Sequence, residues 1–145
     1  MASSGFKSAN RKDDAREGII YFEPKDISPR VWKLDIRDDD YPVVYVNKDI
    51  PEPQVWACQD PVFISSVLPT VLEMVWLYIF RIGDGDETNW MESWVSWADQ
   101  LMPGQNPAFD EEHDIQMIWI EKLIDSFAQR HQLSNLLLAT LKTGK

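Results

Sequence analysis

The sequence predicts an α+β fold in which a short N-terminal β-hairpin or three-stranded sheet precedes a bundle of four to five helices. Apolar residues alternate with period two in runs between residues 18 and 47, whereas between residues 60 and 143 they recur with the period of a helix. Strands followed by helices in this order are typical of the α+β class. A length of 145 residues suits one domain, which we place at residues 18–145, behind a polar and charged tail at residues 1–17 that we expect to be disordered.

Three β-rich runs make up the predicted sheet. Residues 18–22 form a short run that ends before Pro24, and residues 31–37 alternate apolar with charged side chains, as a half-buried strand requires. Three aspartates then form a turn before the third run, residues 41–47, in which Pro42 must lie at the strand start or on a sheet edge. Together the runs predict a hairpin or a three-stranded sheet.

A long apolar helix is predicted at the centre of the fold. Residues 48–60 carry two prolines and are predicted to be a loop, and Asp60 followed by a proline is a helix-start pattern, with the aspartate as N-cap. The helix extends to residue 82, with a kink or a restart at Pro69. Beyond Pro69 its apolar side chains point in every direction and only Glu73 interrupts them, so most of its faces must be buried.

The same segment, residues 62–80, has the length of a membrane-spanning helix. The carboxylate of Glu73 near its middle opposes that interpretation, because a charge at the bilayer centre costs about 2.5–3.5 kcal/mol on insertion scales. Neither flank carries a basic cluster. We therefore expect a buried core helix and no membrane partner.

Three further helices are predicted after this one. Asp86 can cap the first of them, which runs to about residue 102. The second begins at Asp110 and has acids in its first turn, where the helix dipole favours them. The third covers residues 135–142, with Ser134 as its N-cap.

Three of the seven tryptophans lie four and three residues apart in the helix that ends near residue 102. This spacing places their indoles on one stripe of the helix. Such a stripe is most simply core packing against the apolar helix, and the alternative is a groove for a partner, because tryptophan is enriched at binding hot spots. The stripe consists of Trp90, Trp94 and Trp97.

The net charge of −10 is concentrated in one stretch. Residues 84–125 hold eleven acidic groups and a single basic one, Lys122, a balance of −10. A field of this sign repels phosphate backbones, so direct binding of nucleic acid is not expected, whereas a basic protein partner is favoured. The alternative is that the charge serves solubility alone. The acids that we predict to form a binding surface are Asp84, Asp86, Glu87, Glu92, Asp110, Glu111, Glu112 and Asp114.

The titratable residues give no catalytic or metal-binding pattern. Glu73 needs a partner or exposure to solvent, since burying a bare carboxylate is costly; Lys33 or Arg37 could reach it, and a functional acid is the alternative. The loop at residues 84–87 lacks the later ligands of an EF-hand, and Asp110 with His113 lacks further histidines at metal-ligand spacing. No nucleophile-elbow, P-loop or dinucleotide motif is present, so no catalytic residue, metal or cofactor is assigned.

Cysteine usage and the start of the chain bear on the compartment. Cys58 is the only cysteine, which excludes an internal disulfide and suits a reducing environment. Residues 1–18 contain no apolar run of signal-peptide length. A cytoplasmic location is therefore expected.

These observations favour a non-enzymatic protein-binding module that docks through an acidic helical surface onto a basic protein. An inhibitor, an immunity-type protein, a mimic of nucleic-acid charge or an acidic subunit of a complex would act in this way. Two alternatives stay open: a small enzyme whose clustered carboxylates do acid–base chemistry, and a structural subunit of a larger assembly, which would expose a large apolar patch. The sequence does not give the oligomeric state.

Overall fold

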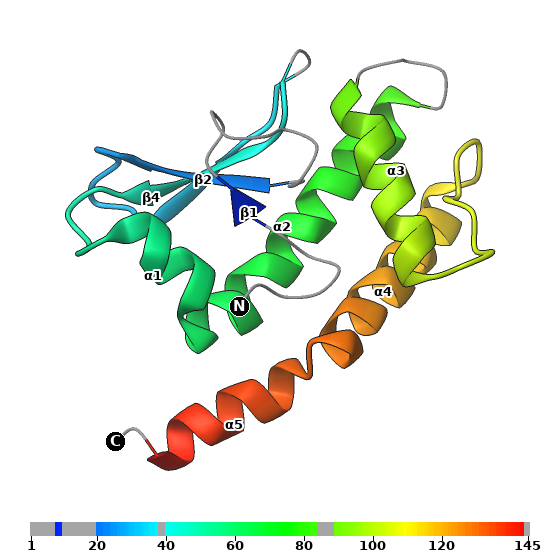
Figure 1. Ribbon diagram of the computed structural model, residues 1–145. Helices are drawn as coiled ribbons and strands as arrows, with labels where there is room; N and C mark the ends of the chain where they lie inside the picture. Colours follow the sequence, from blue (N-terminus) through cyan, green and yellow to red (C-terminus); the bar gives the residue numbers. More distant parts are fainter. Residues whose placement is uncertain (1–7, 10–19, 38–39, 84–88, 144–145) are drawn as a thin grey trace.

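A four-stranded sheet lies beside five helices in the computed structural model, which describes residues 8–9, 20–37, 40–83 and 89–143 (Figure 1). The predicted α+β class is confirmed. In the sheet the strands follow the order β1 (Ser8–Ala9), β2 (Ile20–Lys25), β4 (Val43–Asn47) and β3 (Trp32–Asp35). The helices are α1 (Pro53–Gln59), α2 (Pro61–Ile82), α3 (Asn89–Leu101), α4 (His113–Arg130) and α5 (Leu133–Thr143).

The sheet combines antiparallel and parallel pairing around β4. Strands β3 and β4 form the hairpin that the sequence predicts, with Trp32 opposite Val46. Strand β2 pairs with the other edge of β4 in parallel, from Tyr21 opposite Val43 onward. Strand β4 has neighbours on both sides, and its four residues from Val43 to Val46 are all buried. A strand in this position needs apolar residues on both faces, which explains why its sequence is a continuous apolar run without alternation.

The N-terminal region adds one short strand. Ser8 and Ala9 form β1, which pairs in parallel with the start of β2. These two residues belong to the segment that we expected to be a disordered tail. The rest of residues 1–17 lies outside the described residues, so that expectation stays a prediction for them.

Helix α1 replaces part of the loop predicted at residues 48–60. Pro53 occupies the first turn of this helix, where a proline costs nothing because the N–H that it lacks would have no helical acceptor. Glu52 just before it adopts a left-handed backbone conformation, with φ 47°. The two prolines therefore mark the start of a short helix, and the prediction of an uninterrupted loop was wrong.

Helix α2 begins as predicted and continues through Pro69. The side chain of Asp60 accepts a hydrogen bond of 2.9 Å from the backbone N–H of Phe63, which caps the helix, and a proline follows at the first helical position. By length and composition α2 is long and apolar enough to cross a membrane. Eight of its 22 residues are buried, and it packs against α1, α4 and α5, while Val62 and Met74 are exposed.

The indoles of three helices meet in the core. The ring of Trp76 in α2 lies 4.7 Å from that of Trp119 in α4 and 6.4 Å from that of Trp94 in α3, measured between ring centres. Phe80 packs on the same cluster, 5.5 Å from Trp76 and from Trp119. The core is therefore built around aromatic rings where α2, α3 and α4 meet, consistent with the high tryptophan content.

The last two helices begin at other residues than predicted. Asp110 has φ 64° and lies in the preceding loop, so α4 begins three residues later, at His113. A left-handed residue cannot be part of the first helical turn. Gln132, with φ 50°, makes the turn from α4 into α5, which begins at Leu133. Ser134 is consequently inside the helix and is not its N-cap.

Candidate functional site

The structure places five of the eight predicted acids on the surface. Asp84, Asp86 and Glu87 lie outside the described residues. The other five are all exposed, one on α3 and four around the N-terminus of α4: Glu92, Asp110, Glu111, Glu112 and Asp114.

These acids form no ion pair within the described part of the chain. There, ion pairs join Arg37 to Asp35 at 3.0 Å and Lys48 to Asp49 at 3.8 Å, and both pairs lie in the N-terminal half of the protein. Lys122, the single basic residue between positions 84 and 125, is exposed on α4 and pairs with no described acid. The negative charge is consequently not neutralised by these lysines and arginines, and it projects outward.

The loop before α4 is fastened to the helix that follows it. The side chain of Gln116 donates a hydrogen bond of 3.1 Å to the carbonyl of Ala108, and the indole N–H of Trp119 donates one of 3.3 Å to the carbonyl of Gln105. Asp114 lies in the first turn of α4, where the partial positive charge of the helix end stabilises a carboxylate. The acids at residues 110–114 are thus held on an anchored loop and a helix end.

Two isoleucines lie on the exposed face of α4 among the acids. Ile115 and Ile118 leave 47% and 53% of their surface accessible. Asp114 and Glu121 are exposed on either side of them along the helix. An apolar centre with a charged rim is a common composition for a protein-binding surface.

These isoleucines were not among the site residues predicted from the sequence, because that prediction rested on acids and on the tryptophan stripe alone. Their spacing contained the signal. Ile115 and Ile118 continue to Lys122 and Asp125 in steps of three, four and three, so they share a helical stripe with charged residues. All four are exposed.

The tryptophan stripe of α3 faces the core. Trp90, Trp94 and Trp97 are all buried, and the indole N–H of Trp90 donates a hydrogen bond of 3.0 Å to the carbonyl of Arg37 at the end of the sheet. Of the two interpretations that the sequence left open, burial favours core packing. A partner could not reach these indoles without opening the fold.

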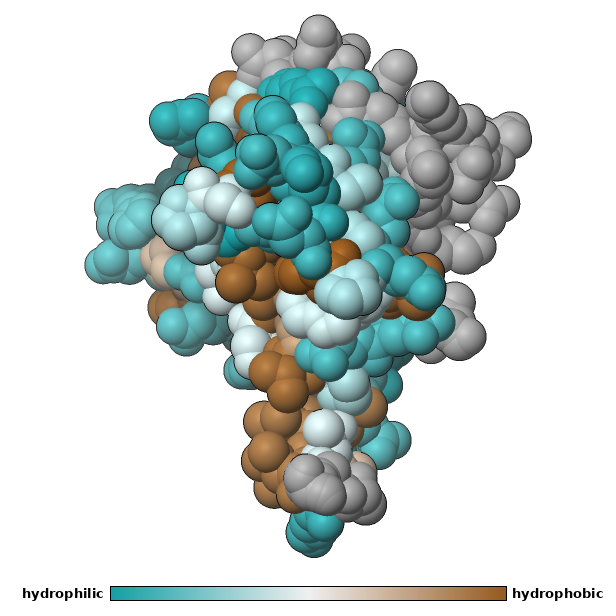
Figure 2. Space-filling view, turned by 90° about the vertical axis from the view of Figure 1, so that its left-hand side faces the viewer, coloured by the Kyte–Doolittle hydropathy of each residue, from teal (hydrophilic) through white to brown (hydrophobic). Residues whose placement is uncertain are grey.

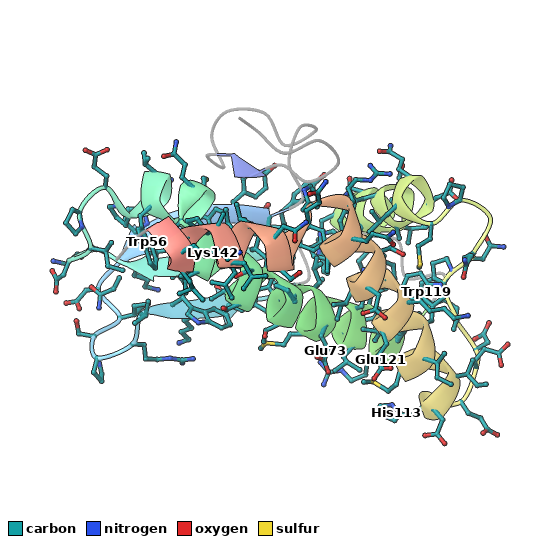
Figure 3. All side chains as sticks on the ribbon, turned by 90° about the horizontal axis from the view of Figure 1, so that it is seen from below. Trp56, Glu73, His113, Trp119, Glu121 and Lys142 are labelled. Carbon is teal, nitrogen blue, oxygen red and sulfur yellow. The ribbon has the colours of Figure 1, made fainter. Side chains whose placement is uncertain are left out.

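Glu73 is half-buried on α2 and has no hydrogen bond or ion pair to any described residue. Seen from below in Figure 3, it lies near the place where α2 and α4 pack against each other, close to Glu121 in that view. Arg37 does not reach it: this guanidinium donates hydrogen bonds to Asp35 and to the hydroxyl of Tyr45 at 2.7 Å, and the bond to Asp35 raises its pKa. Glu73 is thus satisfied by partial exposure.

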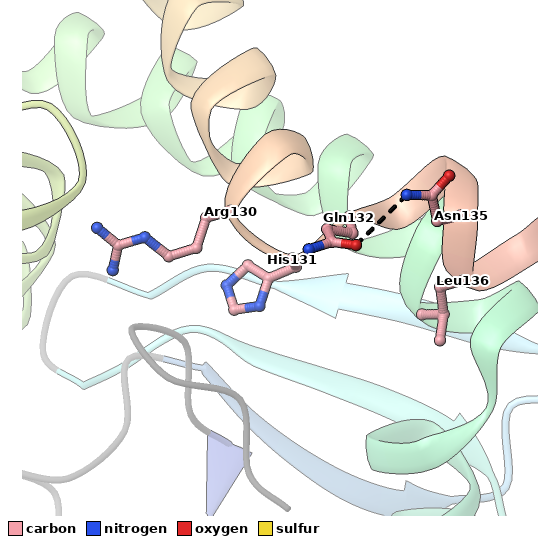
Figure 4. A pocket seen from close by; sticks show the side chains of 5 residues that line it. All are labelled: Arg130, His131, Gln132, Asn135 and Leu136. Carbon is pink, nitrogen blue, oxygen red and sulfur yellow. Dashed lines mark hydrogen bonds between the residues drawn. The ribbon is translucent and has the colours of Figure 1, made fainter.

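A depression lies at the junction of α4 and α5, with a volume of about 380 Å³ (Figure 4). It is lined by Arg130, His131, Gln132, Asn135 and Leu136. Burial, and to a smaller extent the charge of Arg130, lower the pKa of His131. Neither Glu73 nor His113, the two groups that the sequence singles out for acid–base chemistry, lines this depression.

The described residues contain no group of three histidine, cysteine or acidic side chains placed to hold a metal ion. Asp110 and His113 are not on one helical face, because Asp110 lies in the loop before α4. The loop at residues 84–87, the other candidate weighed above, lies outside the described residues.

Comparisons with protein-family models, with curated proteins and with solved structures gave no match to this chain.

Proposed function

We propose that this chain is a non-enzymatic, cytoplasmic binding module that docks through the exposed face of α4 and the loop before it onto a basic protein. The observation that carries the proposal is the set of acids at residues 110–114, which are exposed and have no ion-pair partner among the described residues. Their charge is therefore available to a partner of opposite sign.

The charge and the isoleucines have separate roles in this proposal. Exposed acids steer a basic partner toward the surface and fix its orientation, but each one alone adds little affinity, because water and salt screen it. Ile115 and Ile118 supply apolar area that can be buried on binding. Full burial of an isoleucine side chain contributes about 1.5–3 kcal/mol, so covering the exposed half of each contributes about 1 kcal/mol.

A partner that fits this face has lysines or arginines around an apolar contact. Nucleic acid does not fit, because its phosphates carry the same sign of charge as the face. Inhibition of a basic enzyme, immunity against a basic toxin, mimicry of nucleic-acid charge and membership of a complex all use such a contact. The chemistry of the face is common to all four.

The test is a matched pair of charge-reversed proteins. In one, Asp114→Lys and Glu121→Lys change the exposed face of α4. In the other, Asp49→Lys and Glu52→Lys make the same change in net charge on exposed residues before α1. Proteins captured from native lysate by the wild-type chain are identified by mass spectrometry, and the Kd of each purified candidate is measured calorimetrically for all three forms at 50, 150 and 400 mM salt.

The expected partner is basic, and its affinity falls steadily as salt rises. The α4 variant should bind it at least about tenfold more weakly, while the control variant should bind nearly as the wild type does, because attraction and repulsion act over about one Debye length. A Kd that is insensitive to salt, or equal losses in the two variants, would refute docking through this face.

A further inference from the structure

Helix α5 contains leucines that its packing against the rest of the described chain leaves exposed. Of its five leucines only Leu133 is fully buried, whereas Leu138 and Leu141 leave 48% and 64% of their surface accessible. The helix lies at the lower edge of the molecule and packs mainly on α2 (Figure 1). In Figure 2 the apolar residues gather along one side of this projecting end.

We infer that the exposed leucine stripe of α5 binds the same stripe of a second copy of this chain, in a two-fold symmetric pair. The stripe consists of Leu138 and Leu141, with the half-buried Leu137 beside them. A two-fold axis brings identical surfaces together, so an apolar stripe meets an apolar stripe without any further requirement.

The distribution of charge favours a second copy as the occupant. Lys142 is the only charged residue among the described residues of α5. Its positive charge is opposite in sign to the net charge of the protein, which is −10. The acids at residues 110–114 lie at the other end of α4, which has 18 residues and is therefore about 27 Å long. That distance exceeds the Debye length of about 8 Å at physiological ionic strength, so these acids on two copies do not oppose contact at α5.

In Figure 3, His113, the first residue of α4, and Lys142 of α5 lie in different halves of the view. In an antiparallel pair centred on Leu138, Lys142 of one copy faces Ser134 of the other copy, four residues on the other side of the centre. The two lysines then stay apart. A charged foreign partner would gain nothing from this stripe, whereas the charged face of α4 remains open in the pair.

The test is the molar mass of the full chain in solution. Sedimentation equilibrium from 10 μM to 1 mM should show a shift from 16.9 kDa toward twice that mass, with a Kd on the order of 100 μM, because an interface based on one short helix lies at the small end of the range. The equilibrium should be unchanged or slightly stronger at 500 mM salt, as apolar contact requires.

Two variants with matched changes decide whether α5 is responsible. Leu138→Gln with Leu141→Gln should weaken the dimer at least about tenfold, and Val31→Gln with Met74→Gln, at exposed apolar residues outside both α5 and the exposed face of α4, should leave it unchanged. Circular dichroism confirms that both variants are folded. In a third variant, Leu138→Cys with Cys58→Ser, oxidation should link two copies through position 138.

The inference is overturned by a monomeric mass at 1 mM, by equal effects of the two glutamine variants, or by a dimer that dissociates in high salt. Binding of the wild-type monomer to neutral phosphatidylcholine vesicles, lost in the α5 variant, would assign the stripe to a lipid surface and would equally overturn it. None of these results bears on the acidic face of α4, because that face is unchanged in the α5 variant.

Discussion

Trp76 and Trp90 offer a controlled test of how this core tolerates polar groups. Both side chains are almost completely buried, at 0% and 1% accessibility. The indole N–H of Trp90 donates a hydrogen bond to the carbonyl of Arg37, whereas the indole N–H of Trp76 has no acceptor within the described structure. Replacing each by phenylalanine therefore makes the same change in size and a different change in hydrogen bonding.

The expected difference in stability follows from three contributions. Each substitution leaves a void of about 40 Å³, which at about 24 cal/mol per Å³ costs about 1 kcal/mol. Trp90→Phe also loses a hydrogen bond with a net value of about 1 kcal/mol, so it should destabilise the protein by about 2 kcal/mol. Trp76→Phe removes a buried N–H without an acceptor, and this relief of about 1–3 kcal/mol should offset the void. Its stability should lie between that of the wild type and about 2 kcal/mol above it.

Urea unfolding followed by far-ultraviolet circular dichroism measures both free energies, provided that the dependence on denaturant is the same in all proteins. Trp119→Phe is a useful third variant, because its indole N–H has the carbonyl of Gln105 as acceptor, and it should resemble Trp90→Phe. Equal losses for Trp76→Phe and Trp90→Phe, or a larger loss for Trp76→Phe, would refute the reasoning.

Three further predictions concern helix ends and pH. Asp60→Ala removes the cap of α2 and should lower the free energy of unfolding by about 1 kcal/mol, measured in urea, while Asp60→Asn should retain most of it. Gly83→Ala should lower the free energy of unfolding by about 1–3 kcal/mol, measured as a lower melting temperature. Backbone strain alone is the cause, since Gly83 has φ 97° and no atom lies within 4 Å of an added Cβ. The pKa of His131 is lowered in the folded protein, so as the pH falls below about 6.5 the unfolded chain binds a proton at this residue before the folded protein does. The free energy of unfolding should therefore decrease between pH 7.5 and 5.5. The decrease, measured as the shift of the urea midpoint between these two pH values, should be smaller in His131→Gln.

Those parts of the fold that depend on periodicity could be predicted from the sequence. The alternation at residues 31–37 predicted strand β3, and the spacing of Trp90, Trp94 and Trp97 predicted one helical stripe, which the structure buries. The start of α2 was equally clear, because an N-cap and a following proline act through neighbouring backbone atoms. In each case the determining interactions are local.

The errors occurred where a single backbone conformation decides the structure. Asp110 and Gln132 adopt positive φ, which is uncommon outside glycine, and these conformations moved the starts of α4 and α5 away from the predicted residues. The parallel pairing of β2 with β4 depends on contacts between distant segments, and local alternation contains no information about it.

For the acidic surface, the sign and the approximate position of the charge could be predicted from the sequence. That the acids at residues 110–114 form no ion pair with any described residue could not be predicted, because ion pairing depends on which side chains tertiary structure brings together. The same limit applies to Glu73. The sequence allows Arg37 as its partner, whereas in the structure the guanidinium of Arg37 is hydrogen-bonded to Asp35 and Tyr45.

The position of β4 between β2 and β3 has a consequence for the order of folding. The β3–β4 hairpin closes a short loop between Asp35 and Val43, whereas β2 must pair with β4 across the whole of β3. Short loops close at lower entropic cost, so the hairpin should form early and provide the edge on which β2 docks. Destabilising substitutions in the hairpin should then slow refolding, while those in β2 should chiefly accelerate unfolding.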